Sequence, residues 1–385
     1  MNTLNYYKKF VKIGKQKDGP ANLGSFLKYL KLRLEYKISM QDFFYYKLYD
    51  KSENHDSYYG SLHTAIHKWN YAKPKFMPSI SLWKSITLHV DYTISKMLYP
   101  GLDAMDYFRY EFYNIKRAKR RTFITEGYLV NMDKYFNGGR DKKSHVQHLQ
   151  DKGSFNKKFS DFIQRKWILS INASLDCFRS FCDGLKRVII KPIDGGAGHG
   201  IYIVEINGEE DILKLYENVR NTNSIIEEVI DQHETIRKLN PSSVNTIRVY
   251  SVSHDNSIYI TGGTLRMGCG EKPIDNYSAG GLAAEIDVDS GLVISPAVSQ
   301  NAEKYYVHPY TKIPIIGIQI PFWSEILETV KKAHSLILDL GYVGWDVVVC
   351  NDNSITFLEA NTCSGVELQQ HPGLHGKRPV YERFM

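Results

Sequence analysis

The sequence predicts a protein of the α+β class, and two contrasting stretches of the chain support this prediction. Residues 1–145 show helical spacing, with segments near 24–50, 81–98 and 101–120 that prolines separate. Beyond residue 187, short apolar runs bounded by Gly, Asn and Asp follow one another, which is typical of a largely antiparallel sheet. These runs are 187–193, 201–206, 225–230, 246–253, 257–266, 282–288, 292–297, 343–350 and 355–360.

Two further helical regions are expected, one before these runs and one among them. Residues 150–187 look helical, with a short break near Asn172. A later helix carries its apolar side chains on one face, and Gly341 is expected to end it as a C-cap. That face consists of Trp323, Ile326, Leu327, Val330, His334, Ile337 and Leu338.

The bulk composition indicates a globular protein of several domains. A chain of 385 residues is long enough for two or three, and 43% hydrophobic with 24% charged residues suits a sizeable core. The N-terminus lacks the apolar run of a signal peptide, and no apolar run is long enough to span a membrane. The five cysteines show no C-x-x-C spacing, so we expect free thiols in a reducing compartment, the cytoplasm.

Positive charge is concentrated in the first part of the chain. Residues 1–150 hold 26 Lys and Arg against 13 Asp and Glu, a net +13, whereas the remainder holds 23 against 29, a net −6. Seventeen of the 27 Tyr lie in the first part, and the densest basic cluster is 116–121. Such a region could dock on an anionic surface such as a membrane headgroup layer at the inner face, a diphosphate-linked lipid or nucleic acid, and glycosyltransferases are a further candidate contact. The alternative is a solvated helical face with Tyr in the core. No specific nucleic-acid partner is expected.

A glycine-rich loop lies between two predicted strands. Glycines let backbone N–H groups turn toward phosphate oxygens. In dinucleotide and P-loop sites such a loop leads into a helix, whereas here it leads into the β-branched run from Ile201. A strand–loop–strand flap with Lys191 just before it would grip phosphates from above; the alternative is a tight hairpin with an exposed Lys. The loop residues expected at the phosphates are Gly195, Gly196, Ala197 and Gly198.

A second hairpin places two carboxylates opposite each other. A two-residue turn centred on Asp352-Asn353 would bring Asp346 directly opposite Glu359, with Asn361 on the same face. Facing carboxylates repel, and a cation between them would relieve the repulsion. Two acids and an amide suit Mg²⁺, or Mn²⁺ in its place. The alternative is a solvent-facing acidic pair, and a register slip of one residue would separate the two acids.

In order and spacing these segments resemble the ATP-grasp superfamily, and more closely its sugar-transfer-associated family, over about residues 145–375. The resemblance implies an ATP-grasp fold of two α+β subdomains gripping ATP, behind a helical N-terminal extension. The implied division is 1–140, 141–230 and 231–385. The segments that carry it are Lys191-Pro192, Ile225–Ile230, Gln232-His233-Glu234, Ser243–Val249, Gly263–Met267, Asp275-Asn276, Gly280-Gly281-Leu282 and Asp346 with Glu359-x-Asn361.

The resemblance also implies roles for individual residues. Lys152 and Lys191 would contact the phosphates of ATP, and Asp346, Glu359 and Asn361 would bind Mg²⁺. Two residues depart from the family pattern. His199 stands in the flap where many relatives have Lys or Ser, and Gly344 stands where dipeptide-type ligases place a catalytic Arg. The remaining implied roles are the adenine hinge at Glu227, Glu228, Val229 and Ile230, the ribose acceptor Glu234, substrate contacts at Asn276, Gly280 and Gly281, and catalytic stabilisation by Arg248 and Arg266.

The expected activity is an ATP-dependent carboxylate–amine ligase that forms an amide through an acylphosphate. The substrates would be a small molecule or saccharide with a carboxylate and an amine, and surface-polysaccharide synthesis is implied by the resemblance alone. Two alternatives stay open: an ATP-dependent phosphotransferase, and a non-catalytic nucleotide-binding module that partners glycosyltransferases.

Overall fold

The computed structural model describes residues 69–99, 101–138, 149, 151–171, 173–193, 200–362 and 364–385. The chain forms two compact units, one that ends at Arg121 and includes 125–128, and a second made of 122–124 and everything from Leu129 on. The predicted helix near 24–50 and the loop residues Gly195 to Gly198 and His199 lie outside the described residues. Within the described ranges, no helix has the length and apolar character needed to cross a membrane.

The first unit is helical around an aromatic core. After a helical stretch over 69–76, helix α5 (Leu82–Leu98) begins at Ser81, whose hydroxyl accepts the Lys84 N–H at 3.2 Å. This helix confirms the prediction for 81–98. Its buried Tyr92 stacks on Trp69, with ring centroids 5.1 Å apart. The unit continues with α6 (Ala104–Arg109), η1 (Phe112–Asn114), α7 (Arg117–Arg120) and the start of α8 (Glu126–Asn137).

The segment predicted to be helical near 101–120 is helical but is not one continuous helix. Three short helical pieces replace it, because Glu111 adopts a left-handed conformation, with φ 49°, between the first two. Several tyrosines of this region are buried, as the alternative interpretation of its Tyr content expected. They are Tyr92, Tyr99, Tyr107 and Tyr110.

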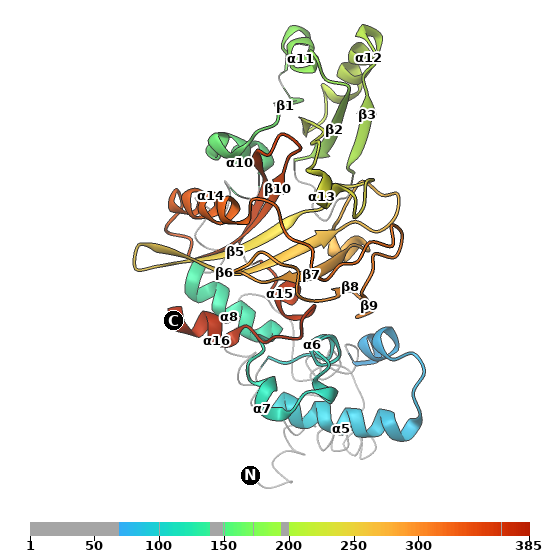
Figure 1. Cartoon of the computed structure of the whole chain (residues 1–385), viewed down its shortest axis with the longest axis vertical. Coiled ribbons are helices and arrows are strands. Elements are labelled where there is room, and N and C mark those ends of the chain that lie inside the picture. Colours follow the sequence, from blue (N-terminus) through green and yellow to red (C-terminus); the bar gives the residue numbers. More distant parts are fainter. Residues whose placement is uncertain are drawn as a thin grey trace, which may run out of the picture. The chain divides into compact units, whose positions relative to one another are not determined.

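The second unit contains, among the described residues, a four-stranded and a seven-stranded antiparallel sheet (Figure 1). The smaller sheet has the order β1-β4-β2-β3. Helices α11 (Leu175–Cys182) and α12 (Glu209–Val219) pack on it through a core that includes Phe178, Leu215 and Val188. Its strands are β1 (Trp167–Leu169), β2 (Arg187–Pro192), β3 (Tyr202–Glu205) and β4 (Ser224–Glu228).

The helix predicted over 150–187 is wrong in its middle part. Helix α10 (Lys152–Lys158) and η3 (Ser160–Phe162) precede β1, which pairs antiparallel with Ile225–Glu227. Three residues are too few to show a strand period, so only the pairing with β4 decides their conformation.

The larger sheet carries the main core. Its order is β11-β10-β5-β6-β7-β8-β9, and α14 (Trp323–Ser335) covers one face with Trp323, Ile326 and Val330 in the core. Short helices α13 (Glu234–Arg237), η4 (Tyr277–Ala279), α15 (Glu367–Gln370), α16 (Arg378–Tyr381) and η5 (Glu382–Phe384) complete the unit. The strands are β5 (Ile247–His254), β6 (Ser257–Met267), β7 (Leu282–Ile286), β8 (Ala297–Val298), β9 (Lys304–Tyr305), β10 (Tyr342–Val349) and β11 (Ile355–Asn361).

Two boundary predictions in this sheet are wrong. Residues 292–297 form only isolated bridges at Leu292 and Val293 before the two-residue strand β8. Helix α14 is capped at Leu336, and Gly341 instead precedes β10. A Cβ on Gly341 would lie 2.6 Å from the carbonyl oxygen of Phe136, so close backbone approach is the reason for glycine there.

The β10–β11 hairpin confirms the predicted pairing of Asp346 with Glu359, although the residues nearer the turn pair one position away from the register expected. The turn is longer than predicted, because the Cys350 N–H donates to the Ser354 carbonyl at 2.8 Å and Asn353 is left-handed, with φ 69°. A bulge at Leu358 then shifts the pairing back, since Val347 faces Phe357 while Asp346 faces Glu359.

Candidate functional site

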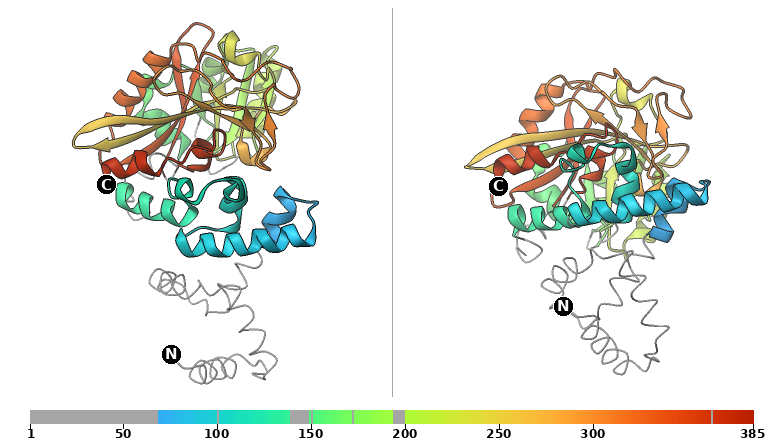
Figure 2. Two further views of the ribbon diagram at one scale, coloured as in Figure 1. Left: turned by 60° about the horizontal axis from the view of Figure 1, so that its bottom comes forward. Right: turned by 90° about the horizontal axis from the view of Figure 1, so that it is seen from below.

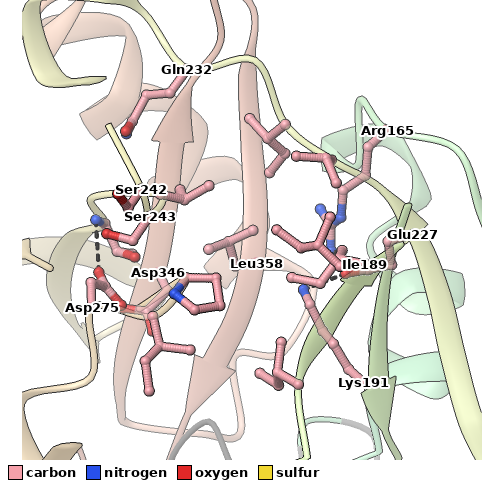
Figure 3. Close-up of a pocket in the computed structure, with 18 of the residues that line it drawn as sticks. Arg165, Ile189, Lys191, Glu227, Gln232, Ser242, Ser243, Asp275, Asp346 and Leu358 are labelled. Atoms are coloured by element: carbon pink, nitrogen blue, oxygen red, sulfur yellow. Dashed lines mark hydrogen bonds and ion pairs between the residues drawn. The ribbon is translucent and has the colours of Figure 1, made fainter. Parts of the chain in front are cut away.

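A cavity of about 260 Å³ lies between the two sheets of the second unit. Figure 3 shows Arg165, Glu227 and Lys191 on the small-sheet side and Asp346 and Asp275 on the large-sheet side. The cavity therefore brings residues far apart in the sequence to one place. Of the predicted site residues, it is lined by Lys152, Lys191, Glu227, Glu228, Val229, Ile230, Arg266, Asn276, Asp346 and Glu359.

Lys191 is held by a buried ion-pair network. Its ammonium donates to the Glu227 carboxylate, which also accepts from Arg165 Nη2 at 2.6 Å and from Asn156 Nδ2 at 3.0 Å. Burial alone would raise the pKa of Glu227, but the positive charges of Arg165 and Lys191 outweigh it and hold the pKa well below its usual value. An ammonium has three donors, so Lys191 keeps N–H groups for a further anion.

Arg165 is a site residue that the sequence analysis missed. Besides Glu227 of the small sheet, its Nη1 donates to the Phe357 carbonyl of β11 at 2.6 Å. The guanidinium therefore ties the two sheets together across the back of the cavity. The residues before β1 carried no recognisable signal, because they were predicted to be helical.

Lys152 lies at the base of the flap. It is the first residue of α10, and its ammonium donates to the carbonyls of Pro192 and Ile193 at 3.0 and 3.1 Å. These carbonyls immediately precede the predicted phosphate loop. Lys152 therefore fixes the last described residues before that loop, and it lines the cavity.

The predicted adenine hinge contains two different features: a buried acid, Glu227, and a stretch of backbone at the cavity, Val229 and Ile230. Glu227 acts through its side chain, as described above, and the Glu228 N–H donates to the Lys166 carbonyl at 2.9 Å. The next two residues, Val229 and Ile230, are half-buried at the cavity, and within the described ranges their backbone groups make no main-chain hydrogen bond. Partly buried backbone groups without partners suit a ligand with a planar donor and acceptor edge.

Asp346 is clamped by two arginines from neighbouring strands. Arg248, directly opposite it on β5, donates through Nε to Oδ1 and through Nη2 to Oδ2 at 2.6 Å. Arg266 on β6 donates through Nη1 to Oδ2 at 2.7 Å, and its Nη2 donates to Asp275 at 3.0 Å. Burial favours the protonated form of Asp346, but the two arginines outweigh it and hold its pKa well below the usual range.

Gly344 makes room for this clamp. It faces the side of the sheet that Arg248 crosses, and a Cβ there would lie 2.7 Å from Ser364 Cβ and 3.3 Å from Arg248 Cδ. Arg248 Nη1 also donates to Ser364 Oγ at 2.9 Å. A positive charge is thus present beside Asp346, supplied from β5 in place of the position two residues before it.

Glu359 lines the cavity, and Asn361, two residues farther along β11, is half-buried beside it but is not among the lining residues. Asn361 donates through Nδ2 to Glu359 Oε1 at 3.2 Å, which leaves its amide oxygen as an acceptor. The Glu359 side chain is 44% exposed, because it faces the cavity. Removal of the carboxylate from water by the surrounding protein raises the pKa of Glu359 above its usual value, and the negative charge of Asp346 raises it further.

The donor set fits a divalent cation, although for a different reason from the one the sequence suggested. The two arginines already neutralise Asp346, so repulsion within the pair does not by itself call for a metal. Arg248 and Arg266 carry two positive charges, against three carboxylates when Glu359 is ionised: Asp346, Glu359 and Asp275. The remaining negative charge, with the Asn361 amide oxygen, forms an oxygen-only set of the kind Mg²⁺ prefers. In the described ranges no group of three or more His, Cys, Asp and Glu side chains could hold a metal alone.

Three further residues that the sequence predicted for the site do not line the cavity. Glu234 is exposed at the start of α13 and does not line the cavity. Gly280 and Gly281 also lie off the cavity and shape the turn behind Asn276, since Gly280 has φ +102° and the Gly281 N–H donates to the Asn276 carbonyl at 3.0 Å. The same turn presents Asp275, which supports Arg266 and accepts the Thr246 N–H at 2.9 Å.

The sugar-transfer associated ATP-grasp family matches residues 140–384. Because this match covers more than half of the chain, the chain belongs to that family, and its two antiparallel sheets are those of an ATP-grasp protein. Its members are ATP-dependent ligases. No curated protein matches the chain in sequence.

Solved structures resemble the chain only distantly. The ATP-grasp ligase PsnB, complexed with a minimal precursor, Mg and ADP, is 12% identical, covering 70% of this chain and 67% of its own, with a TM-score of 0.39. N5-carboxyaminoimidazole synthase from Aspergillus clavatus is 10% identical over 59% of this chain and 51% of its own, with a TM-score of 0.36. An L-amino acid ligase from Bacillus licheniformis is 11% identical over 62% and 48%, also with a TM-score of 0.36. This chain thus spans half to two thirds of these proteins.

Proposed function

We propose that this member of the sugar-transfer associated ATP-grasp family is an ATP-dependent carboxylate–amine ligase. The observation that carries the proposal is the arrangement across one cavity of Lys191 on the small sheet and the Asp346–Glu359 pair on the large sheet. Phosphoryl transfer has two requirements. Cations must face the phosphates, and carboxylates must hold a metal ion.

The nucleotide would lie between the sheets. The unpaired backbone edge of Val229 and Ile230 suits adenine, and Lys191 lies farther along the same wall of the cavity, where phosphates would follow. Lys152 would act indirectly, by fixing the carbonyls that precede the phosphate loop. A divalent cation held by Glu359, Asp346 and Asn361 would neutralise phosphate charge.

Arg266 would position the carboxylate substrate, whereas Arg248 does not line the cavity and would act through Asp346. Arg266 Nε is buried and, in the described part of the chain, has no hydrogen-bond partner, and the residue lines the cavity. Such a donor can bind an anion without first breaking an internal bond. The carboxylate oxygen attacks the γ-phosphorus, the bond to ADP breaks, and an acylphosphate forms. The amine nitrogen then attacks the acyl carbon, phosphate leaves, and the amine loses one proton.

The proposal also names the substrates and the pathway. The carboxylate substrate would be a sugar acid, the acceptor an amino acid or other amine, and the pathway surface-polysaccharide synthesis. The test measures ADP and phosphate release with Mg²⁺ and a panel of uronic acids and amino acids, with products identified by mass spectrometry. We expect release only when both a carboxylate and an amine are present. A phosphorylated product that accumulates without an amine would indicate a phosphotransferase, and nucleotide binding without turnover across the panel would indicate a non-catalytic module.

A further inference from the structure

The C-terminal segment, residues 364–381, covers the face of the large sheet that carries the arginine clamp. Arg248 on β5 pairs with Thr264 on β6, so both side chains point to the same face of the sheet. The Thr264 hydroxyl donates to the carbonyl of Leu368 in α15 at 3.1 Å. The core residues that alternate with them along the strands point the other way, toward α14. Figure 2 shows the segment, in dark red, along the sheet.

Two glycines in one row of the sheet make room for this segment. Gly344 on β10 and Gly262 on β6 both pair with Tyr250 on β5, which lies between them. A Cβ on Gly344 would lie 2.7 Å from Ser364 Cβ. A Cβ on Gly262 would lie 2.8 Å from Gln369 Oε1. The sheet therefore receives two polar side chains of the segment at fixed places.

A chain of buried hydrogen bonds joins these two places. The Tyr381 hydroxyl donates to Gln369 Oε1 at 2.8 Å, and Gln369 Nε2 donates to the Tyr342 hydroxyl at 3.1 Å. The Tyr342 hydroxyl in turn donates to the Ser364 carbonyl at 2.9 Å. Burial raises the pKa of Tyr342 well above its usual value, so this hydroxyl keeps its proton. Such a chain holds one geometry, because each broken bond would leave a buried polar group without a partner.

Ser364 gives Arg248 a third fixed contact. The guanidinium binds Asp346 through Nε and Nη2, and its Nη1 donates to Ser364 Oγ at 2.9 Å. A planar group that is held at all three of its nitrogens cannot rotate without breaking a hydrogen bond. Asp346 lines the cavity and Arg248 does not, so a displaced guanidinium would affect the cavity through the Asp346 carboxylate.

We propose that Ser364 and Tyr342 are positioning residues of the metal site, which hold Arg248 in the orientation that directs Asp346 into the cavity. The inference rests on the proposed function, because it concerns a carboxylate that would bind the divalent cation. Neither Ser364 nor Tyr342 lines the cavity, so an effect of either on the cation must pass through Arg248 and Asp346. Groups that orient a metal ligand from behind typically change metal affinity or activity by about 10–100-fold.

The experiment compares the full chain with Ser364→Ala, Tyr342→Phe and the double variant. The binding of Mn²⁺ alone is followed through the paramagnetic signal of the free ion, and kcat and KM for ATP are measured at saturating Mn²⁺. We expect each single variant to raise the Kd for Mn²⁺ about tenfold and to lower kcat, with the KM for ATP unchanged. The double variant should match the more impaired single variant, because both residues act on the same guanidinium.

Two matched variants control for the loss of a buried hydroxyl. Ser251→Ala removes a hydroxyl on the opposite face of β5, where it accepts from Trp345 Nε1 at 2.9 Å. Tyr99→Phe removes a buried tyrosine hydroxyl that, like that of Tyr342, donates to a backbone carbonyl. Both controls should lower the melting temperature and leave the Kd for Mn²⁺ and kcat unchanged.

The outcomes separate this inference from the ligase function. Wild-type affinity for Mn²⁺ in both Ser364→Ala and Tyr342→Phe, or an equal loss of affinity in the two controls, would overturn the positioning role and leave the ligase function standing. A wild-type protein that binds Mn²⁺ but forms no amide would refute the ligase function, and the Mn²⁺ affinities of the variants would still decide this inference. A wild-type protein that binds no Mn²⁺ would overturn the metal site and the inference together.

Discussion

Arg248 and Asp346 lie directly opposite each other on the paired strands β5 and β10, and the guanidinium donates to both carboxylate oxygens. Arg266 from the next strand completes the neutralisation of Asp346. In consequence the two acids of the hairpin are not equivalent. Asp346 is buried and paired, whereas Glu359 faces the cavity and has a raised pKa.

Substitution of the two acids should therefore have different effects. Asp346→Asn leaves two buried guanidinium groups without their shared partner and should destabilise the fold by about 3–5 kcal/mol, besides removing activity. Glu359→Gln removes a carboxylate that is 44% exposed and should change the melting temperature little while it abolishes metal-dependent turnover. Thermal unfolding and a Mg²⁺ titration of each variant measure this difference. Full activity of Glu359→Gln at every Mg²⁺ concentration would remove Glu359 from the metal set.

Binding of a divalent cation should release protons. The folded protein raises the pKa of Glu359 above 4.5, so the carboxyl holds its proton to a higher pH than an exposed Glu does. The cation needs the ionised form and must displace that proton, so its affinity should fall as pH decreases through the raised pKa. Calorimetric titration of Mg²⁺ in buffers of different ionisation enthalpy counts the protons released. Cation binding that releases no protons at any pH would contradict the prediction, and Glu359→Gln is the control.

The space above Gly344 should be essential for the clamp. A Cβ there would press on Ser364 and on the Arg248 side chain. Gly344→Ala should destabilise the protein by about 1–3 kcal/mol and lower turnover more than ATP binding, because Arg248 is displaced from Asp346. Gly208→Ala is a suitable control, since nothing lies within 4 Å of a Cβ at that position and the residue has extended backbone with φ 172°. Unchanged kcat in Gly344→Ala would show that the position of Arg248 is immaterial.

Arg165 should govern ATP affinity through the Glu227–Lys191 pair. Arg165→Lys keeps a positive charge near Glu227 but cannot also reach the Phe357 carbonyl, so the link between the sheets is lost. We expect KM for ATP to rise about tenfold and kcat to fall less, with a stability loss of about 1–3 kcal/mol. Arg220→Lys, at an exposed ion pair with Glu217, provides the control for the substitution itself. A loss of stability without any change in KM would give Arg165 a purely structural role.

The sequence alone predicted the α+β class, most strands of both sheets and the meeting of Asp346 with Glu359. Strand runs could be recognised because alternation and bounding turn residues are local. The pairing itself was predicted from a turn that is one residue too short, and the bulge at Leu358 compensates for that error. The sequence contains one local sign of this bulge. Phe357 and Ala360 are both core residues, although residues three apart in a regular strand point to opposite faces of the sheet.

Tertiary structure decided which side chains neutralise these acids. Nothing along the chain indicates that β5 and β6 lie beside β10, so the clamp by Arg248 and Arg266 could not be derived from spacing. Trp167–Leu169 became a strand only through pairing with β4, and Arg165 just before it then reaches both sheets. Local sequence sets the period and the turns, whereas the partners of a buried charge are set by long-range strand order, which depends on packing of the whole core.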